Sequence, residues 1–171
     1  MVTPWVVLSL GISQLVCWGV TTYLIGVFGP HIEADLGWSG SAVYGGFSAA
    51  LVVMGLVSPW AGRLIDRFGG RLVMGAGSCL SAVACAGIAV ATNLVGYYLA
   101  WCLLGVGMRL VLYDAAFATL ARIGGTQARQ AMSQITLLGG LASTVFWPIG
   151  HFLAEHLGWR LAVLAYGGFA L

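Results

Sequence analysis

The sequence predicts an all-α membrane protein, a polytopic bundle of transmembrane helices with five complete spans and part of a sixth. Two features of its composition carry this prediction. Of the 171 residues, 60% are hydrophobic and only 7% are charged, and the mean hydropathy is +0.97. A soluble domain carries about 25% charged residues, so this chain is too apolar to cover a surface that faces water. A third observation is that the charged residues gather in short clusters between long apolar runs.

The apolar runs predict where the chain crosses the bilayer, because a spanning helix needs about 20 mostly apolar residues. The first run has no basic residue before it and is longer than the apolar core of a signal peptide, so we expect a retained helix. Thr92-Asn93 separates the third run from the fourth. All runs belong to one domain, residues 1–171, with spans at about 4–30, 37–62, 72–92, 94–120 and 131–153 and a partial span at 159–171.

The arginines predict the orientation of the bundle. Five of the seven basic residues lie in the loops after the second and fourth spans, and these are Arg63, Arg67, Arg71, Arg122 and Arg129. Loops rich in arginine stay in the cytoplasm, so we expect a cytoplasmic amino terminus in an integral, multi-pass protein of a bacterial inner membrane. The lipid bilayer is the expected surrounding. No basic stretch suits a nucleic acid, so no nucleic-acid partner is expected.

Residues 62–71 contain the most informative motif, because they read Gly-Arg-Leu-Ile-Asp-Arg-Phe-Gly-Gly-Arg. This stretch resembles the G-x-L-x-D-R-x-G-x-R/K signature between the second and third helices of major facilitator superfamily transporters. Gly-Trp-Arg at 158–160 is also common in that family. The resemblance implies a major-facilitator-like amino-terminal half of a twelve-helix transporter. It also implies that the chain is truncated within the sixth helix and needs its carboxy-terminal half or a partner chain.

The signature has a physical rationale of its own. Its glycines permit a tight turn, and an aspartate among arginines can accept charge-assisted hydrogen bonds in a compact polar latch. In the family, the matching aspartate and arginines pin the loop to the carboxy-terminal half and stabilise the outward-open state. The alternative is a cluster that sets topology alone. The resemblance implies a gating motif of Gly62, Asp66, Arg67, Gly69 and Arg71.

Arg109 and Asp114 are the ionisable residues deepest within an apolar run. A charge at such depth costs about 3 kcal/mol or more unless it is paired or hydrated. Their spacing of five residues would place them about 140° apart on a continuous helix, so we expect no pairing between them. Arg109 is either an anion-binding group, because its guanidinium suits a carboxylate, or half of a structural pair. Asp114 is either structural or a proton-coupling carboxylate.

Polar side chains along one face of the first span and of the fifth span are further candidates for a substrate cavity. In the resembling family the first, second, fourth and fifth helices line the cavity. Hydroxyl groups in membrane helices also commonly bond to their own backbone, so a structural role is the alternative for each. The candidates, with a tyrosine of the fourth span, are Gln14, Trp18, Thr21, Thr22, Tyr113 and Thr136.

Small residues recur along two spans and predict close helix packing, since small side chains let membrane helices approach one another. They are Gly11, Gly19 and Gly26 in the first span, and Gly75, Ser78, Ser81 and Cys85 in the third.

Together these features predict a secondary active transporter that moves a small solute by alternating access. Arg109 favours an organic anion such as a monocarboxylate. The alternatives are an inactive truncated fragment and a half-transporter that works with a partner chain. Drug efflux is a weaker reading because residues 146–150, Phe-Trp-Pro-Ile-Gly, lack the paired glycines of the drug–proton antiporters. No catalytic or metal-ligating cluster is evident, so we expect no enzyme activity, no cofactor and no metal.

Overall fold

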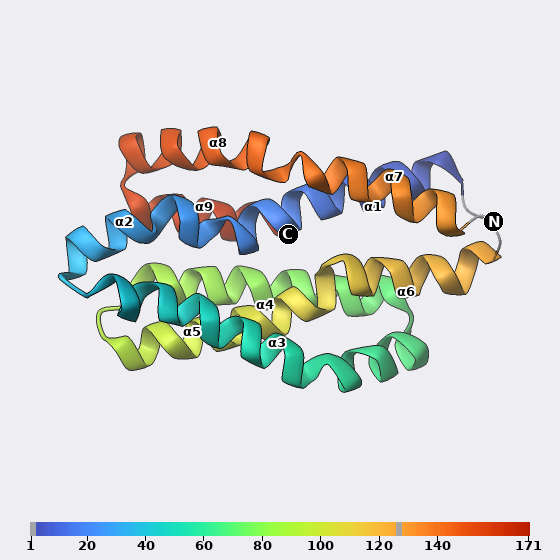
Figure 1. Cartoon of the computed structure of the whole chain (residues 1–171), viewed down its shortest axis with the longest axis horizontal. Coiled ribbons are helices and arrows are strands. Elements are labelled where there is room, and N and C mark those ends of the chain that lie inside the picture. Colours follow the sequence, from blue (N-terminus) through green and yellow to red (C-terminus); the bar gives the residue numbers. More distant parts are fainter. Residues whose placement is uncertain (1–2, 126–127) are drawn as a thin grey trace.

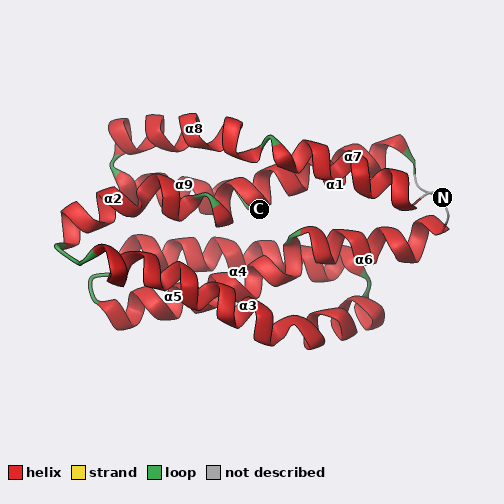
Figure 2. Cartoon of the chain, viewed as in Figure 1, coloured by secondary structure: helices red, strands yellow, loops and turns green. Residues whose placement is uncertain are grey.

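A computed structural model describes residues 3–125 and 128–171, without the side chains of residues 123 and 124. All of its regular elements are helices (Figure 2). In chain order they are α1 (Pro4–Cys17), the π-helix η1 (Trp18–Thr22), α2 (Leu24–Leu36), α3 (Gly40–Phe68), α4 (Gly70–Val90), α5 (Leu94–Val111), α6 (Tyr113–Gly124), α7 (Ala128–Gly140), α8 (Ala142–Leu157) and α9 (Trp159–Phe169).

Five stretches of helix are long and apolar enough to cross a membrane, and α9 follows the last of them. This confirms the all-α bundle of five spans with a further helix. The spanning stretches are Pro4–Leu36, Gly40–Phe68, Gly70–Val90, Leu94–Arg122 and Ala128–Leu157.

Several helices extend beyond the apolar runs that predicted the spans. The first span continues beyond residue 30 to Leu36, and the second continues beyond residue 62 to Phe68. Charged residues end the apolar run, but they do not end a helix. The helices end instead at Gly37 and Gly69, whose φ angles of +65° and +81° favour glycine. Residues 62–68 are therefore the last turns of α3, and a single glycine separates α3 from α4.

Three of the five spans are interrupted near their middle, and two are not. The first contains the π-turn η1, which the Tyr23 amide closes by donating to the carbonyl of Trp18 at 3.3 Å. The fourth breaks at Leu112, between α5 and α6, and the fifth turns at Leu141, between α7 and α8. The second span, α3, and the third, α4, are continuous helices.

The helices lie roughly parallel to the long axis of the molecule (Figure 1). In this view α1, α2, α7 and α8 lie above α3, α5 and α6. α1 runs along α7, and α9 contacts both α4 and α8. We name the end that holds residues 62–71 and the α6–α7 connection the signature end. The other end, where α2 leads into α3 and α8 into α9, is the opposite end.

Small residues pack the first span against the fifth, as the glycine spacing predicted. A Cβ on Gly11, Gly19 or Gly26 would meet the side chain of Leu138, Phe146 or Trp147, respectively. In the third span, Ser81 packs against Gly107 and Cys85 against Gly167, whereas a Cβ on Gly75 would meet nothing within 4 Å. The close contact of the third span with its neighbours therefore lies on the face of Ser81 and Cys85, and Gly75 is outside it.

Candidate solute-binding site

The candidate site is built around the break in the fourth span. Leu112 has an extended backbone, with φ −74° and ψ −174°. Its carbonyl accepts hydrogen bonds from the amides of Ala115 and Ala116 at 3.0 and 3.3 Å, so α6 starts as a separate helix. The break lies between Arg109 and Asp114, so these two residues belong to different helices.

Arg109 and Asp114 form an ion pair across this break. Arg109 Nη1 donates to Asp114 Oδ2 at 2.6 Å. The expectation that the two residues do not pair was wrong, because the helical-wheel argument assumed a continuous helix. The side chain of Arg109 is 20% exposed and that of Asp114 is 60% exposed. The pair therefore lies at the surface of this bundle, with the arginine as the more enclosed partner.

Gln14 joins the first span to the same break. Its side chain is fully buried, and Nε2 donates to the carbonyl oxygen of Val111 at 2.8 Å. Val111 is the last residue of α5, where carbonyls lose their partners within the helix. Gln14 therefore satisfies a backbone group that the break releases.

An aromatic group connects the three interrupted spans. The rings of Trp18 and Tyr113 lie 5.1 Å apart, and Tyr113 stacks on Phe117 at 5.4 Å. The Tyr113 hydroxyl donates to the backbone carbonyl of Thr136 at 3.2 Å. The hydroxyl of Thr136 itself donates to Met132 at 2.8 Å. Thr136 therefore contributes its carbonyl to this group, and its side chain bonds within its own helix.

Several buried polar atoms beside the breaks have no hydrogen-bond partner in the described part of the protein. They are Gln14 Oε1, Trp18 Nε1, Thr22 Oγ1 and Arg109 Nε. Thr21 differs, because its buried hydroxyl donates to the carbonyl of Cys17 at 2.6 Å. Three other such atoms in the described part of the protein, on His31, Ser81 and Trp101, lie away from the breaks. An unpaired polar atom in a membrane interior is costly, so the four atoms beside the breaks make this region a candidate site for a polar ligand.

The structure adds residues that sequence reasoning missed. Phe117 completes the aromatic stack, and the Val111 carbonyl is the acceptor for Gln14. One weak signal for the break was available: Asp114 lies in the first turn of α6, where acidic residues favour a helix start. Neither Val111 nor Phe117 has a side chain that distinguishes it from the other apolar residues of the run.

The signature end has a different arrangement from the expected latch. Asp66 is exposed, and its carboxylate forms no ion pair within 4.0 Å among the described residues. The guanidinium of Arg67 lies 5.1 Å from the ring centroid of Phe68. Gly69 makes the turn, whereas Gly62 lies inside α3 with nothing within 4 Å of an added Cβ. The gating role of these residues stays a prediction.

A hollow of about 580 Å³ also lies at the signature end, and Arg71 is the only member of the gating motif among the residues that line it. The other lining residues are Trp5, Val6, Ser9, Leu10, Met74 and Thr119. None of the candidates beside the breaks lines this hollow, so the two features are separate.

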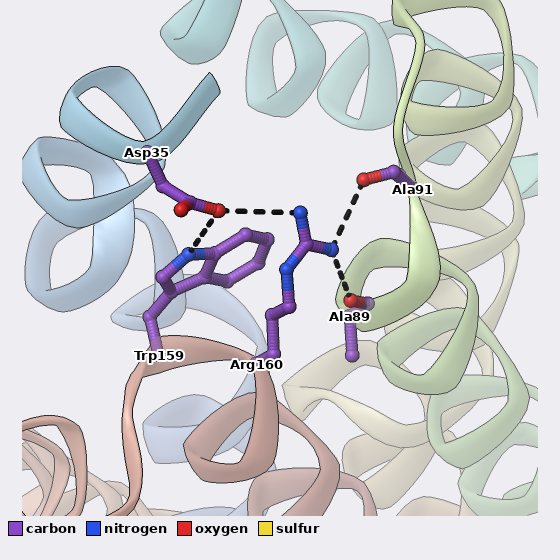
Figure 3. A network of polar contacts seen from close by, with 5 residues as sticks. All are labelled: Asp35, Ala89, Ala91, Trp159 and Arg160. Carbon is purple, nitrogen blue, oxygen red and sulfur yellow. Dashed lines mark hydrogen bonds and ion pairs between the residues drawn. The ribbon is translucent and has the colours of Figure 1, made fainter. Parts of the chain in front are cut away.

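At the opposite end, Arg160 holds three elements together (Figure 3). Its Nη1 donates to the carbonyls of Ala89 and Ala91 at 2.7 and 3.2 Å, and its Nη2 pairs with Asp35 at 3.2 Å. Asp35 also accepts a hydrogen bond from Trp159 Nε1 at 3.1 Å. The Gly-Trp-Arg motif thus ties the start of α9 to α2 and to the end of α4.

Comparison with known proteins places this chain in a family. The profile of the Major Facilitator Superfamily matches residues 10–171. The chain is 26% identical over 172 residues to human "Monocarboxylate transporter 6", an alignment that covers 98% of this chain and 33% of that protein. The chain thus spans about a third of the length of that relative. This multi-pass membrane protein belongs to the Major Facilitator Superfamily of transporters.

Proposed function

We propose that this bundle is part of a secondary active transporter that moves a small organic anion, a monocarboxylate, by alternating access. The carrying observation is Arg109, which lies at the break of the fourth span and whose buried Nε has no partner among the described residues. Discontinuous helices commonly surround the midplane sites of secondary transporters. The name of the human relative supports the same class of solute.

Arg109 would bind the carboxylate through its planar fork of donors. In this structure the bond to Asp114 uses one nitrogen of the Arg109 guanidinium, Nη1. A solute carboxylate can therefore bind to the remaining donors or displace Asp114. The rings of Trp18 and Tyr113, with centroids 5.1 Å apart, pack against each other beside the breaks, and their edges would contact the apolar part of the solute.

Asp114 would couple this exchange to protons. When a solute carboxylate takes its place on Arg109, Asp114 loses its cationic partner. Binding a proton then removes its negative charge, so that one proton enters with each anion. The exposure of the Asp114 side chain, 60%, gives it contact with water for this step.

Transport needs a second bundle, either a carboxy-terminal half of the same polypeptide or a partner chain. Asp66, Arg67 and Arg71 are exposed at the signature end, so they are available to contact that bundle. Gly62 and Gly69 belong to the same gating motif. We place the amino terminus in the cytoplasm and the protein in a bacterial inner membrane, because arginines are concentrated at the signature end.

The test is uptake into proteoliposomes that contain the native protein with this bundle. We expect radiolabelled L-lactate to enter, and lactamide of the same size to stay outside, because only the first offers a carboxylate to Arg109. Arg109→Lys keeps the charge but loses the fork, and should raise the KM for lactate about tenfold. The matched control, Arg129→Gln, removes an exposed arginine elsewhere and should leave the KM unchanged. Equal uptake of both solutes would refute an anion site.

A further inference from the structure

The turn of α3 that carries Asp66 is held from the fourth span. Arg122, in the last turn of α6, donates through Nη1 to the carbonyls of Ile65 and Asp66, both at 3.0 Å. These acceptors are 57 and 56 residues away in the sequence. The carbonyls in the last turn of a helix carry partial negative charge and can accept a further donor. A guanidinium satisfies them and neutralises that charge.

α6 also contacts the other side of the same corner. The side chain of Thr119 lies where a Cβ on Gly70 would be, so α6 touches the first residue of α4. The Ile65 carbonyl additionally accepts the amide of Gly69 at 2.9 Å, which is the bond that closes the turn. Arg122 and Gly69 thus share one acceptor, and a change in the position of Arg122 affects the turn directly.

The amino-terminal end of α6 is attached to the candidate solute site. Asp114, in its first turn, pairs with Arg109. Asp114 and Arg122 both belong to α6, so these two attachments are separated by about 12 Å of helix. Leu112 precedes α6 with an extended backbone, and Gly125 follows it with φ +50°. A short helix with a non-helical residue at each end can move as a unit.

We propose that Arg122 is a positioning residue for the corner between α3 and α4, residues 65–70, which we name the gating corner. We also propose that α6 transmits the state of the Arg109–Asp114 pair to Arg122. When the pair is intact, α6 is fixed at both ends and Arg122 holds the last turn of α3. When an anion takes Arg109, the amino-terminal end of α6 loses its ionic attachment and keeps only the packing and hydrogen bond of Tyr113, so the hold on Ile65 and Asp66 weakens. The role of this corner in gating rests on the proposed function, but the hold itself does not.

Amide hydrogen exchange of the native protein in lipid nanodiscs tests the hold without transport. In Arg122→Gln we expect the Gly69 amide to exchange about tenfold faster, because a charge-assisted bond to its acceptor is lost. Arg122→Lys should give an intermediate rate, since an ammonium reaches a carbonyl without the fork. Arg129→Gln should leave the rate unchanged. Peptides from residues 94–104 report whether each variant is folded. If the Gly69 amide exchanges at the same rate in the glutamine and parent proteins, the hold is refuted.

A double-mutant cycle tests the transmission. Asp114→Ala should also speed exchange at Gly69, and it should add nothing in the Arg122→Gln background, because the hold is already lost. Additive effects, or no effect of Asp114→Ala, would overturn the transmission. Lactate flux gives a second readout: Arg122→Gln should lower Vmax several-fold with the KM unchanged. Unchanged Vmax in a protein that transports lactate would remove Arg122 from gating. If lactate is not transported at all while the exchange pattern appears, the proposed function fails and the hold stands.

Discussion

Two arginine–aspartate pairs lie at different levels of the bundle, and their surroundings differ. Arg160 pairs with Asp35, donates to two backbone carbonyls and lies over the Trp159 ring at 4.4 Å. Arg109 pairs with Asp114, and its buried Nε has no partner in the described part of the chain. A guanidinium offers five donors, and only Arg160 has distributed its donors among several groups of the protein.

The difference separates a structural arginine from the one that we propose binds the solute. Arg160 connects α9, α2 and the end of α4, so its bonds contribute to stability (Figure 3). Arg109 pairs with a residue only five positions away in the chain, on the other side of the break at Leu112. An ion pair therefore says little about function until the remaining donors of the arginine are counted. Four substitutions sharpen or break this distinction.

Arg109→Gln should have the largest effect of the four substitutions, and it should change transport but hardly change stability. Loss of a charged partner for the solute carboxylate should lower Vmax/KM for lactate about 100-fold. The free energy of unfolding should change by less than about 1 kcal/mol, because a partly exposed pair within one span is lost. Flux into proteoliposomes and unfolding in mixed micelles measure the two quantities. A large loss of stability with normal flux would reverse the assignment.

Arg160→Gln should give the opposite pattern. The carbonyls of Ala89 and Ala91 belong to residues that are nearly fully buried, and both lose a charged donor. We expect a loss of about 2 kcal/mol in the free energy of unfolding. The KM for lactate should stay within about twofold, since the guanidinium contacts none of the candidates at the breaks. A KM that rises as much as in the Arg109 variant would contradict the distinction.

Gln14→Leu should have a smaller effect on stability. It removes the buried bond to the Val111 carbonyl and leaves that acceptor without its partner. The expected loss is about 1–2 kcal/mol, as for a buried backbone group that loses its bond. Ser9→Ala in the same helix is the control, because its exposed hydroxyl bonds only to its own helix, at the Trp5 carbonyl. Equal stability of the two variants would mean that Gln14 does not support the break.

Asp35→Asn should have the smallest effect. The side chains of Asp35 and Arg160 are 49% and 36% exposed, so water screens the pair. The amide oxygen can still accept from Trp159, and the Arg160 bonds to Ala89 and Ala91 remain. We expect a loss of about 0.5 kcal/mol, measured by the same unfolding experiment. A loss as large as in Arg160→Gln would show that the ion pair, and not the carbonyl bonds, holds this end together.

The spans could be predicted from the sequence, and the breaks could not. Apolar length alone locates the spans, because the bilayer sets that length. The residues expected to interrupt a helix are Pro30, Pro59 and Pro148, yet each lies within a continuous helix. Membrane bundles tolerate proline where neighbouring groups satisfy the freed backbone. The breaks occur instead at Trp18–Thr22, Leu112 and Leu141.

Because the breaks could not be predicted, only the parts of the candidate site that do not depend on them were found. Gln14 and Trp18 were identified because they share a polar face of the first span. The pairing of Arg109 with Asp114 was missed because it depends on the backbone of Leu112, an apolar residue like its neighbours. A break held by a side chain from another span, as Gln14 holds Val111, leaves no trace in the local sequence.

The π-turn in the first span changes the helical phase of everything that follows it. One inserted residue rotates the subsequent side chains by about 100° relative to an uninterrupted α-helix. The first span therefore presents two faces in succession: α1 contacts mainly α7, with α5 and α8 beside it, whereas α2 contacts α3, α8 and α9. In the structure a Cβ added to Gly26 would meet Trp147 at 3.0 Å. Deleting one residue between positions 18 and 22 would restore a single helical phase and turn Gly26 away from Trp147. One extra residue thus lets a single span pack against α7 along its first half and against α3 and α9 along its second half.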